Sequence, residues 1–108
     1  MNVGHRHGWV VLTLRGELDI ATVPVLHEHV DDAIRAAAER DLPPQVALDL
    51  IALVFCDSSG LNLLIRAWKQ ITASGGRILL LQPRRRLRET LACAGLDRYL
   101  TIAATVPA

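Results

Sequence analysis

The stretch ALDLIALVFCDSSGL (residues 47–61) decides the fold, because it joins a strand to the start of a helix. Its first part is apolar on both alternating faces apart from Asp49, a pattern typical of a strand that helices cover on both sides in a parallel sheet. The run stops at an aspartate, two serines and a glycine, and apolar residues then resume at helical spacing. The helical stripe expected to face the core is Leu61, Leu64, Ile65, Trp68 and Ile71.

Toward the N-terminus, the sequence predicts two strands and a helix. Residues 9–14 (WVVLTL) are rich in β-branched residues and predict a strand, which Gly16 is expected to break, with a short edge strand ahead of it. A helix is expected from Val23, with Thr22 as its cap and its end at DLPP (residues 41–44). The sequence therefore predicts that this helix connects the first long strand to the strand within residues 45–55.

Toward the C-terminus, the same alternation continues. A buried strand is expected at residues 77–82, a third helix over residues 83–94 with Leu87 and Leu91 facing inward, and a last short strand at residues 100–106. The order β-β-α-β-α-β-α-β predicts an α/β fold with a mostly parallel, mixed sheet of about five strands. Right-handed crossovers are expected to place helices on both sides of that sheet.

Composition narrows the class of protein. A length of 108 residues predicts one domain, 1–108, and a hydrophobic content of 51% argues against disorder. A formal net charge of +1 and an aromatic content of 4% give no basis for direct nucleic-acid binding. No apolar stretch is long enough for membrane insertion and no signal peptide is recognisable, so a cytoplasmic location is expected. Cys56 and Cys93 lack metal-ligand spacing and are expected to be buried free thiols.

Residues 57–60 (DSSG) form the candidate functional site, because functional groups of open α/β sheets gather beyond the carboxyl ends of the strands. One interpretation is structural: Asp57, Ser58 or Ser59 caps the helix, and Gly60 eases the turn. The other is that a serine hydroxyl at the positively polarised helix start accepts a phosphate. The two are compatible, because one residue can cap the helix while its neighbour points outward.

Three other kinds of functional site fit the sequence less well: a hydrolase nucleophile, a phosphorylated receiver aspartate and a histidine metal site. A hydrolase nucleophile needs glycines two positions either side of the serine, and neither Ser58 nor Ser59 has both. A phosphorylated receiver aspartate at Asp57 would need a late lysine, whereas the only lysine is Lys69, within the second helix. The pairs His5-x-His7 and His27-x-His29 are expected to be exposed side chains; a metal pincer at the first pair is the alternative. No catalytic residue, metal or cofactor is therefore expected.

The segment PRRRLRE (residues 83–89) places four arginines in the first turns of the third helix. Positive charge at a helix N-terminus opposes the macrodipole. A solvated face is one explanation for these arginines, and contact with an acidic partner is the other.

Three longer segments together resemble the STAS domain of bacterial anti-sigma factor antagonists: GELDIATVPVL (16–26), VALDLIALVFCDSSGLNLLIRAWKQITASGGRILLL (46–81) and LRETLACAGLDRYLTI (87–102). The resemblance implies that the first serine of the DSSG motif, Ser58, is a phospho-acceptor. It also implies that the unphosphorylated protein binds an anti-sigma factor serine kinase and releases its sigma factor, and that a metal-dependent serine phosphatase restores this form. The partner-binding residues that it implies are Asp19, Thr22, Asp57, Ser58, Ser59, Gly60 and Asn62.

An alternative role is compatible with the same fold. Some small STAS proteins that resemble this chain are cytoplasmic subunits of lipid-transport ATPase complexes, and phosphorylation would not regulate such a subunit. An enzyme would need a general base, and the sequence pattern assigns no residue to that role.

Overall fold

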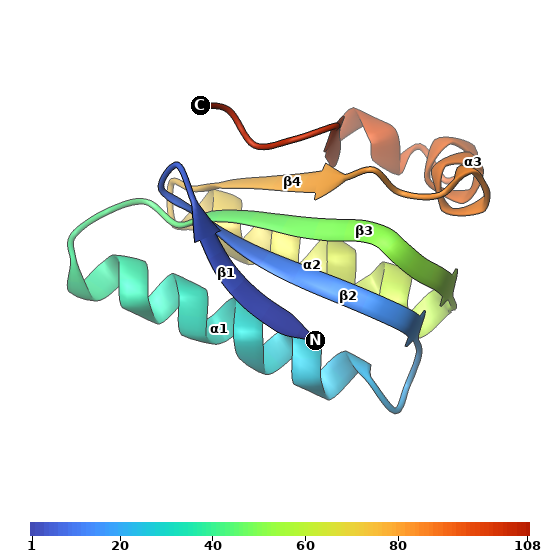
Figure 1. The fold of residues 1–108 in the computed structure, drawn as a ribbon, viewed down its shortest axis with the longest axis horizontal. Helices are drawn as coiled ribbons and strands as arrows, with labels where there is room; N and C mark the ends of the chain where they lie inside the picture. Colours follow the sequence, from blue (N-terminus) through green and yellow to red (C-terminus); the bar gives the residue numbers. More distant parts are fainter.

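Five strands form a single sheet in the computed structural model, which describes residues 1–108 (Figure 1). The strands are β1 (Asn2–Arg6), β2 (Trp9–Leu18), β3 (Gln45–Cys56), β4 (Arg77–Leu81) and β5 (Thr101–Ala103). They lie in the order β1-β2-β3-β4-β5; β1 is antiparallel to β2, and the other neighbours are parallel. The helices are α1 (Val23–Glu39), α2 (Ser58–Ala73), α3 (Arg85–Cys93) and a short 3-10 helix, η1 (Leu96–Arg98). The predicted α/β fold with a mixed sheet is confirmed.

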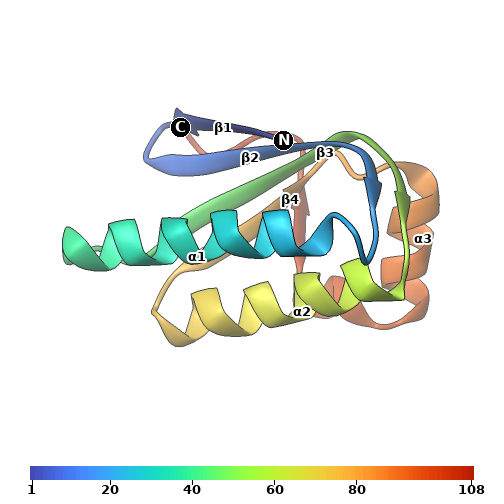
Figure 2. The ribbon, with the colours of Figure 1, turned by 90° about the horizontal axis from the view of Figure 1, so that it is seen from below.

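The helices α1 and α2 lie on the same face of the sheet (Figure 2). The prediction of helices on both sides was wrong. Strand order follows chain order, so every right-handed crossover advances in the same direction and leaves its helix on the same face. The buried side chains of α3, Leu87 and Leu91, belong to this same helix-covered core.

The opposite face of the sheet carries a smaller apolar cluster without a covering helix. Its buried members are Trp9, Val11, Ala47, Leu79, Leu81 and Val106. Val106 comes from the C-terminal segment, and the guanidinium of Arg77 lies 5.2 Å from the centre of the Trp9 ring. No helix covers this face, so its strand residues are buried only within this cluster, to which the C-terminal segment contributes Val106.

The buried arc of α2 is broader than the predicted stripe. Leu64 and Ile71 are buried as predicted, whereas Leu61, Ile65 and Trp68 are only half-buried. The fully buried positions include Leu63 and Ala67, because α2 packs against both the sheet and α1. The ring of Trp68 instead packs on Tyr99, with 5.2 Å between ring centroids.

Strand β2 does not break at Gly16 but continues to Leu18. Gly16 has a φ of +74°, and the register between β2 and β3 shifts on either side of it. These shifts are bulge-like irregularities that bend a strand pair without ending it. The bent ends remain paired, so that Leu18 lies opposite Cys56.

Two further boundaries differ from the predicted ones. Helix α3 begins at Arg85 and not at Pro83, and β5 spans only Thr101–Ala103 where residues 100–106 were expected. None of the helices is long and apolar enough to cross a membrane.

Candidate functional site

The candidate site lies where β2 and β3 end side by side. The amide of Asp57 donates a hydrogen bond of 3.2 Å to the carbonyl of Leu18, directly before the loop of residues 19–22. The structure therefore brings the GELD segment and the DSSG segment to the same end of the sheet, from positions some forty residues apart. The loop that carries Asp19 and Thr22 therefore begins next to the residue that precedes the two serines.

Asp57 is the residue that caps α2. Its backbone is extended, with φ −90° and ψ −172°, and its Oδ1 accepts a hydrogen bond of 3.1 Å from the amide of Gly60. Its carbonyl accepts a second bond from the amide of Leu61. Of the three capping candidates in the motif the structure selects the aspartate, a preferred N-cap residue. Neither serine is needed for the cap.

Ser58 and Ser59 are the first two residues of α2. Ser58 is exposed and Ser59 is half-buried, and neither hydroxyl makes a hydrogen bond within the protein. Their amides have no intrahelical acceptor at these positions and carry part of the positive end of the helix dipole. An anionic group on the Ser58 hydroxyl would therefore lie beside free N–H donors.

Gly60 is required by a close approach between elements. A Cβ at this position would lie 2.6 Å from the Sγ of Cys56 and 2.9 Å from the carbonyl oxygen of Leu18. The φ of Gly60 lies outside the left-handed region, so the expected role of easing a turn does not hold. The absent side chain instead lets the first turn of α2 rest against the ends of β2 and β3.

The loop after β2 is held by its own side chains. Oδ1 of Asp19 accepts hydrogen bonds from the amides of Ala21 (3.0 Å) and Thr22 (3.2 Å). The hydroxyl of Thr22 accepts from the amide of Asp19 at 2.9 Å and lies 3.0 Å from the carbonyl oxygen of Glu17, to which it can donate. These bonds fix a loop that leaves Ile20 at its surface, with 79% of the residue exposed.

Thr22 does not cap α1 with its side chain, contrary to prediction. Its backbone is helical, with φ −100° and ψ −20°, and its hydroxyl bonds back into the loop. The carbonyl of Asp19 accepts the amide of Val23 at 2.8 Å, so backbone from the loop supports the helix start. Asp19 and Thr22 therefore shape this part of the site.

Asn62 is exposed on α2, about one turn after Ser58. Together with Ser59 it borders a shallow, open depression whose other walls are Val23, Ile65 and Arg66. The predicted partner-binding residues thus divide into two groups. Ser58, Ser59 and Asn62 offer side chains to solvent, whereas Asp57, Gly60, Asp19 and Thr22 hold the backbone beneath.

Sequence reasoning missed the exposed apolar side chains around this end of the sheet. Val54 is 57% exposed and Phe55 is 48% exposed, although the pattern predicted a strand covered on both faces. The pattern of apolar residues along β3 could not reveal this exposure, because the exposure depends on where the neighbouring strand β4 ends. Strand β4 pairs with β3 only as far as Asp49.

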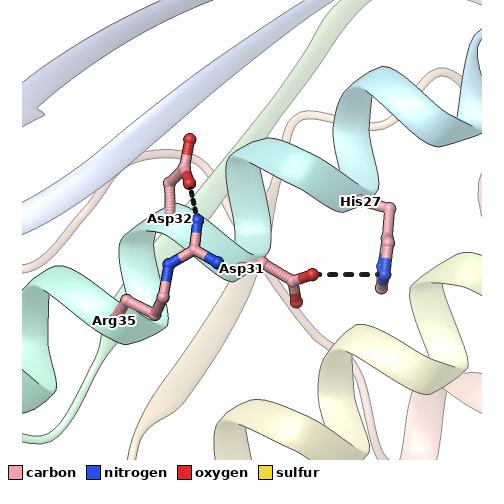
Figure 3. A network of polar contacts seen from close by, with 4 residues as sticks. All are labelled: His27, Asp31, Asp32 and Arg35. Atoms are coloured by element: carbon pink, nitrogen blue, oxygen red, sulfur yellow. Dashed lines mark hydrogen bonds and ion pairs between the residues drawn. The ribbon is translucent and has the colours of Figure 1, made fainter.

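The histidines do not form the pincer that the sequence left open. His5 lies on β1, whereas His7 lies in the following turn with a φ of +52°, and both are exposed as expected. His27 and His29 are half-buried, contrary to expectation. His27 pairs with Asp31 at 3.2 Å, next to the Asp32–Arg35 ion pair on the same helix (Figure 3). These local pairs support α1 and lie outside the site.

The two cysteines differ in environment. Burial, reinforced by the neighbouring charge of Asp57, raises the pKa of the Cys56 thiol to about 11. Cys93 is exposed, which corrects the expectation that both thiols are buried, and Cys56 is half-buried. A thiol with a raised pKa is a poor nucleophile at neutral pH, because the thiolate is the reactive form. Cys56 is therefore a packing residue beneath Gly60.

We expect iodoacetamide at pH 8 to alkylate Cys93 about tenfold or more faster than Cys56 in the folded protein, because the Cys56 thiolate is scarce. Peptide mass spectrometry over time would measure both rates. In denaturant the two rates should converge, since unfolding removes the burial that raises the pKa. Equal rates in the folded protein would contradict the assigned environment of Cys56.

This chain is similar to proteins of known family. The family model for the STAS domain matches residues 1–108. The anti-sigma F factor antagonist of Paenibacillus polymyxa is 30% identical over 98 residues, which cover 91% of this chain and 80% of that protein. The one from Lysinibacillus sphaericus is 32% identical over 91 residues, covering 84% and 74%.

Solved structures agree with this fold. A candidate anti-sigma factor antagonist from Thermotoga maritima superposes with a TM-score of 0.84 at 24% identity, covering 97% of this chain and 86% of that one. Phosphorylated SpoIIAA, a cell fate determinant of Bacillus, gives a TM-score of 0.72 at 27% identity, with coverage of 94% and 89%. Unphosphorylated SpoIIAA gives 0.74 at 24% identity, with coverage of 97% and 88%. Both forms of SpoIIAA thus share this architecture.

Proposed function

The chain belongs to the STAS domain family, and from this membership we propose that it is an anti-sigma factor antagonist controlled by phosphorylation of Ser58. The unphosphorylated form binds an anti-sigma factor serine kinase in the cytoplasm and so releases the sigma factor. The kinase transfers the γ-phosphoryl group of ATP to the Ser58 oxygen, with loss of the hydroxyl proton and release of ADP. A metal-dependent serine phosphatase hydrolyses the ester and restores binding.

One observation carries this proposal: the Ser58 hydroxyl is exposed and unbonded at a helix start that Asp57 already caps. A kinase can reach this hydroxyl without unfolding the domain. Phosphorylation adds about 1.5 to 2 negative charges and three strong acceptor oxygens. The free N–H groups of the first turn of α2 can donate hydrogen bonds to these oxygens, so the domain need not rearrange.

Phosphorylation then weakens binding because the modified surface no longer fits the kinase. The phosphate lies next to the carboxylate of Asp57 in sequence and creates a local concentration of negative charge. A partner surface fitted to a neutral hydroxyl meets added bulk, a desolvation cost and like-charge repulsion. The contact surface that we propose comprises Ser58, Ser59 and Asn62, on a scaffold formed by Asp57, Gly60, Asp19 and Thr22. The protein itself is a regulator in this scheme, and Ser58 is a modified residue and not a nucleophile.

The test is intact-mass spectrometry after incubation with ATP and each anti-sigma factor kinase encoded by the source organism. We expect one phosphate on the wild type and on Ser59→Ala, and none on Ser58→Ala. Ser59→Ala is the matched control because it removes the neighbouring hydroxyl from the same helix turn. A phosphate on Ser58→Ala would contradict the assignment. Absence of phosphate on every variant, with kinases active on another substrate, would favour the transporter-subunit role.

A further inference from the structure

Strand β3 extends beyond its neighbour β4, and α3 begins in the space that this leaves (Figure 1). Pairing between the two strands ends at Asp49 and Leu81. Beyond that point β3 pairs only with β2. The Nε of Arg84 donates a hydrogen bond of 2.9 Å to the carbonyl of Ile51, which ties the start of α3 to the unpaired edge.

A groove of about 90 Å³ lies between this edge and α3. We call it the β3–α3 groove; its apolar wall runs from Leu53 to Cys56 and includes Leu87, and Arg84 and Arg86 lie at its rim. Val54 and Phe55 expose about half of their surface here. The volume is far below that of typical small-molecule sites, which hold several hundred Å³. It suits a single apolar side chain of a protein partner.

The β3–α3 groove is lined by positive charge only. Arg84 and Arg86 are the only charged side chains that line it, and neither forms an ion pair. The first turn of α3 contains no acidic residue, and no side chain caps it. Arginines at the positive end of a helix raise its energy unless an anion approaches. The chain itself provides no such anion in the groove.

We propose that the β3–α3 groove binds an acidic, apolar segment of the anti-sigma factor kinase. An apolar side chain of the kinase packs between Phe55 and Leu87, while an aspartate or glutamate pairs with Arg86. The groove ends at Cys56, and Asp57 and Ser58 follow it directly in the chain. The groove thus lies at the end of β3 that leads directly into the proposed phosphorylation site. This inference rests on the proposed function, because its occupant is part of the same kinase.

The experiment measures the dissociation constant of the kinase that phosphorylates this protein, with a non-hydrolysable ATP analogue bound, by isothermal titration calorimetry. We expect Arg86→Glu to bind about tenfold or more weakly than wild type, since charge reversal replaces attraction by repulsion. Arg88→Glu is the matched control. It makes the same charge change on the same helix, but Arg88 borders a different depression, beside Glu89 and Asp97. We expect its dissociation constant to stay within about twofold of wild type.

Thermal melts establish that both variants are folded, which is expected because both arginines are exposed. Carbodiimide coupling adds a structural readout: Arg86→Lys should crosslink to a kinase carboxylate, and Arg88→Lys should not. Equal affinity of all three proteins, or an equal loss in both Glu variants, would overturn the groove proposal and leave Ser58 control intact. Failure of every kinase of the organism to bind the wild type would overturn the proposed function and this inference with it.

Discussion

The Ser58→Asp variant is expected to bind the anti-sigma factor kinase about a hundredfold more weakly than wild type. The substitution places a permanent negative charge on an exposed position next to Asp57. Like charges brought together in an interface cost several kcal/mol, and about 2.7 kcal/mol corresponds to a hundredfold in affinity. Calorimetric titration of the kinase with each protein would measure the difference.

Ser58→Asn separates charge from shape, because asparagine has nearly the size of aspartate and no charge. We expect it to retain most of the affinity that Ser58→Asp loses. The stability of Ser58→Asp should equal or exceed that of wild type, since a negative charge in the first turn of α2 is favourable by about 0.3 to 1 kcal/mol. Equal kinase affinity for wild type and Ser58→Asp would refute control by charge. An equal loss of kinase affinity in Ser58→Asp and Ser58→Asn would show that side-chain size, and not charge, weakens binding.

Gly60→Ala is expected to lower the free energy of unfolding by about 2 kcal/mol. Helix propensity alone would predict a gain of up to about 1 kcal/mol from this change. The close approach outweighs it, because the new Cβ would lie 2.9 Å from the carbonyl oxygen of Leu18. That oxygen also accepts the amide of Asp57, so it cannot move without loosening the junction. Urea titration of both proteins would measure the difference.

Gly4→Ala is the matched control for that substitution. Gly4 lies on the exposed strand β1, and a Cβ there would meet nothing within 4 Å. Its stability should stay within about 0.5 kcal/mol of wild type. Adding Cys56→Ala to Gly60→Ala should restore only part of the loss, because the thiol contact disappears while the backbone contact with Leu18 persists. A Gly60→Ala protein as stable as wild type would show that α2 can move away from β2 without cost.

Much of the fold could be predicted because its signals are local. The apolar run of β3, the helical stripes and the DLPP terminator give the order of elements, which the structure confirms. The side of the sheet on which each helix lies could not be predicted in this way. It depends on the direction of successive crossovers, and therefore on strand order, which no single segment encodes.

The candidate site shows the same division. Its position at a strand-to-helix junction, and an N-cap within the DSSG motif, could be predicted from the residue types alone. The selection of Asp57 over the serines depends on backbone geometry at the junction. The functional roles of Ser58, Ser59, Asn62, Asp19 and Thr22 stay predictions that the binding and phosphorylation experiments test.

By itself, the sequence determined the α/β class, the strand–DSSG–helix junction and an unusual set of arginines at the start of α3, because each depends on the properties of neighbouring residues. Only the tertiary structure decided that the loop of Asp19 lies beside the motif, that Gly60 is needed for a close approach, and that Val54 and Phe55 are exposed. These features depend on where other strands end. An apolar residue is buried only if another element covers it, and β4 stops before it reaches this end of β3.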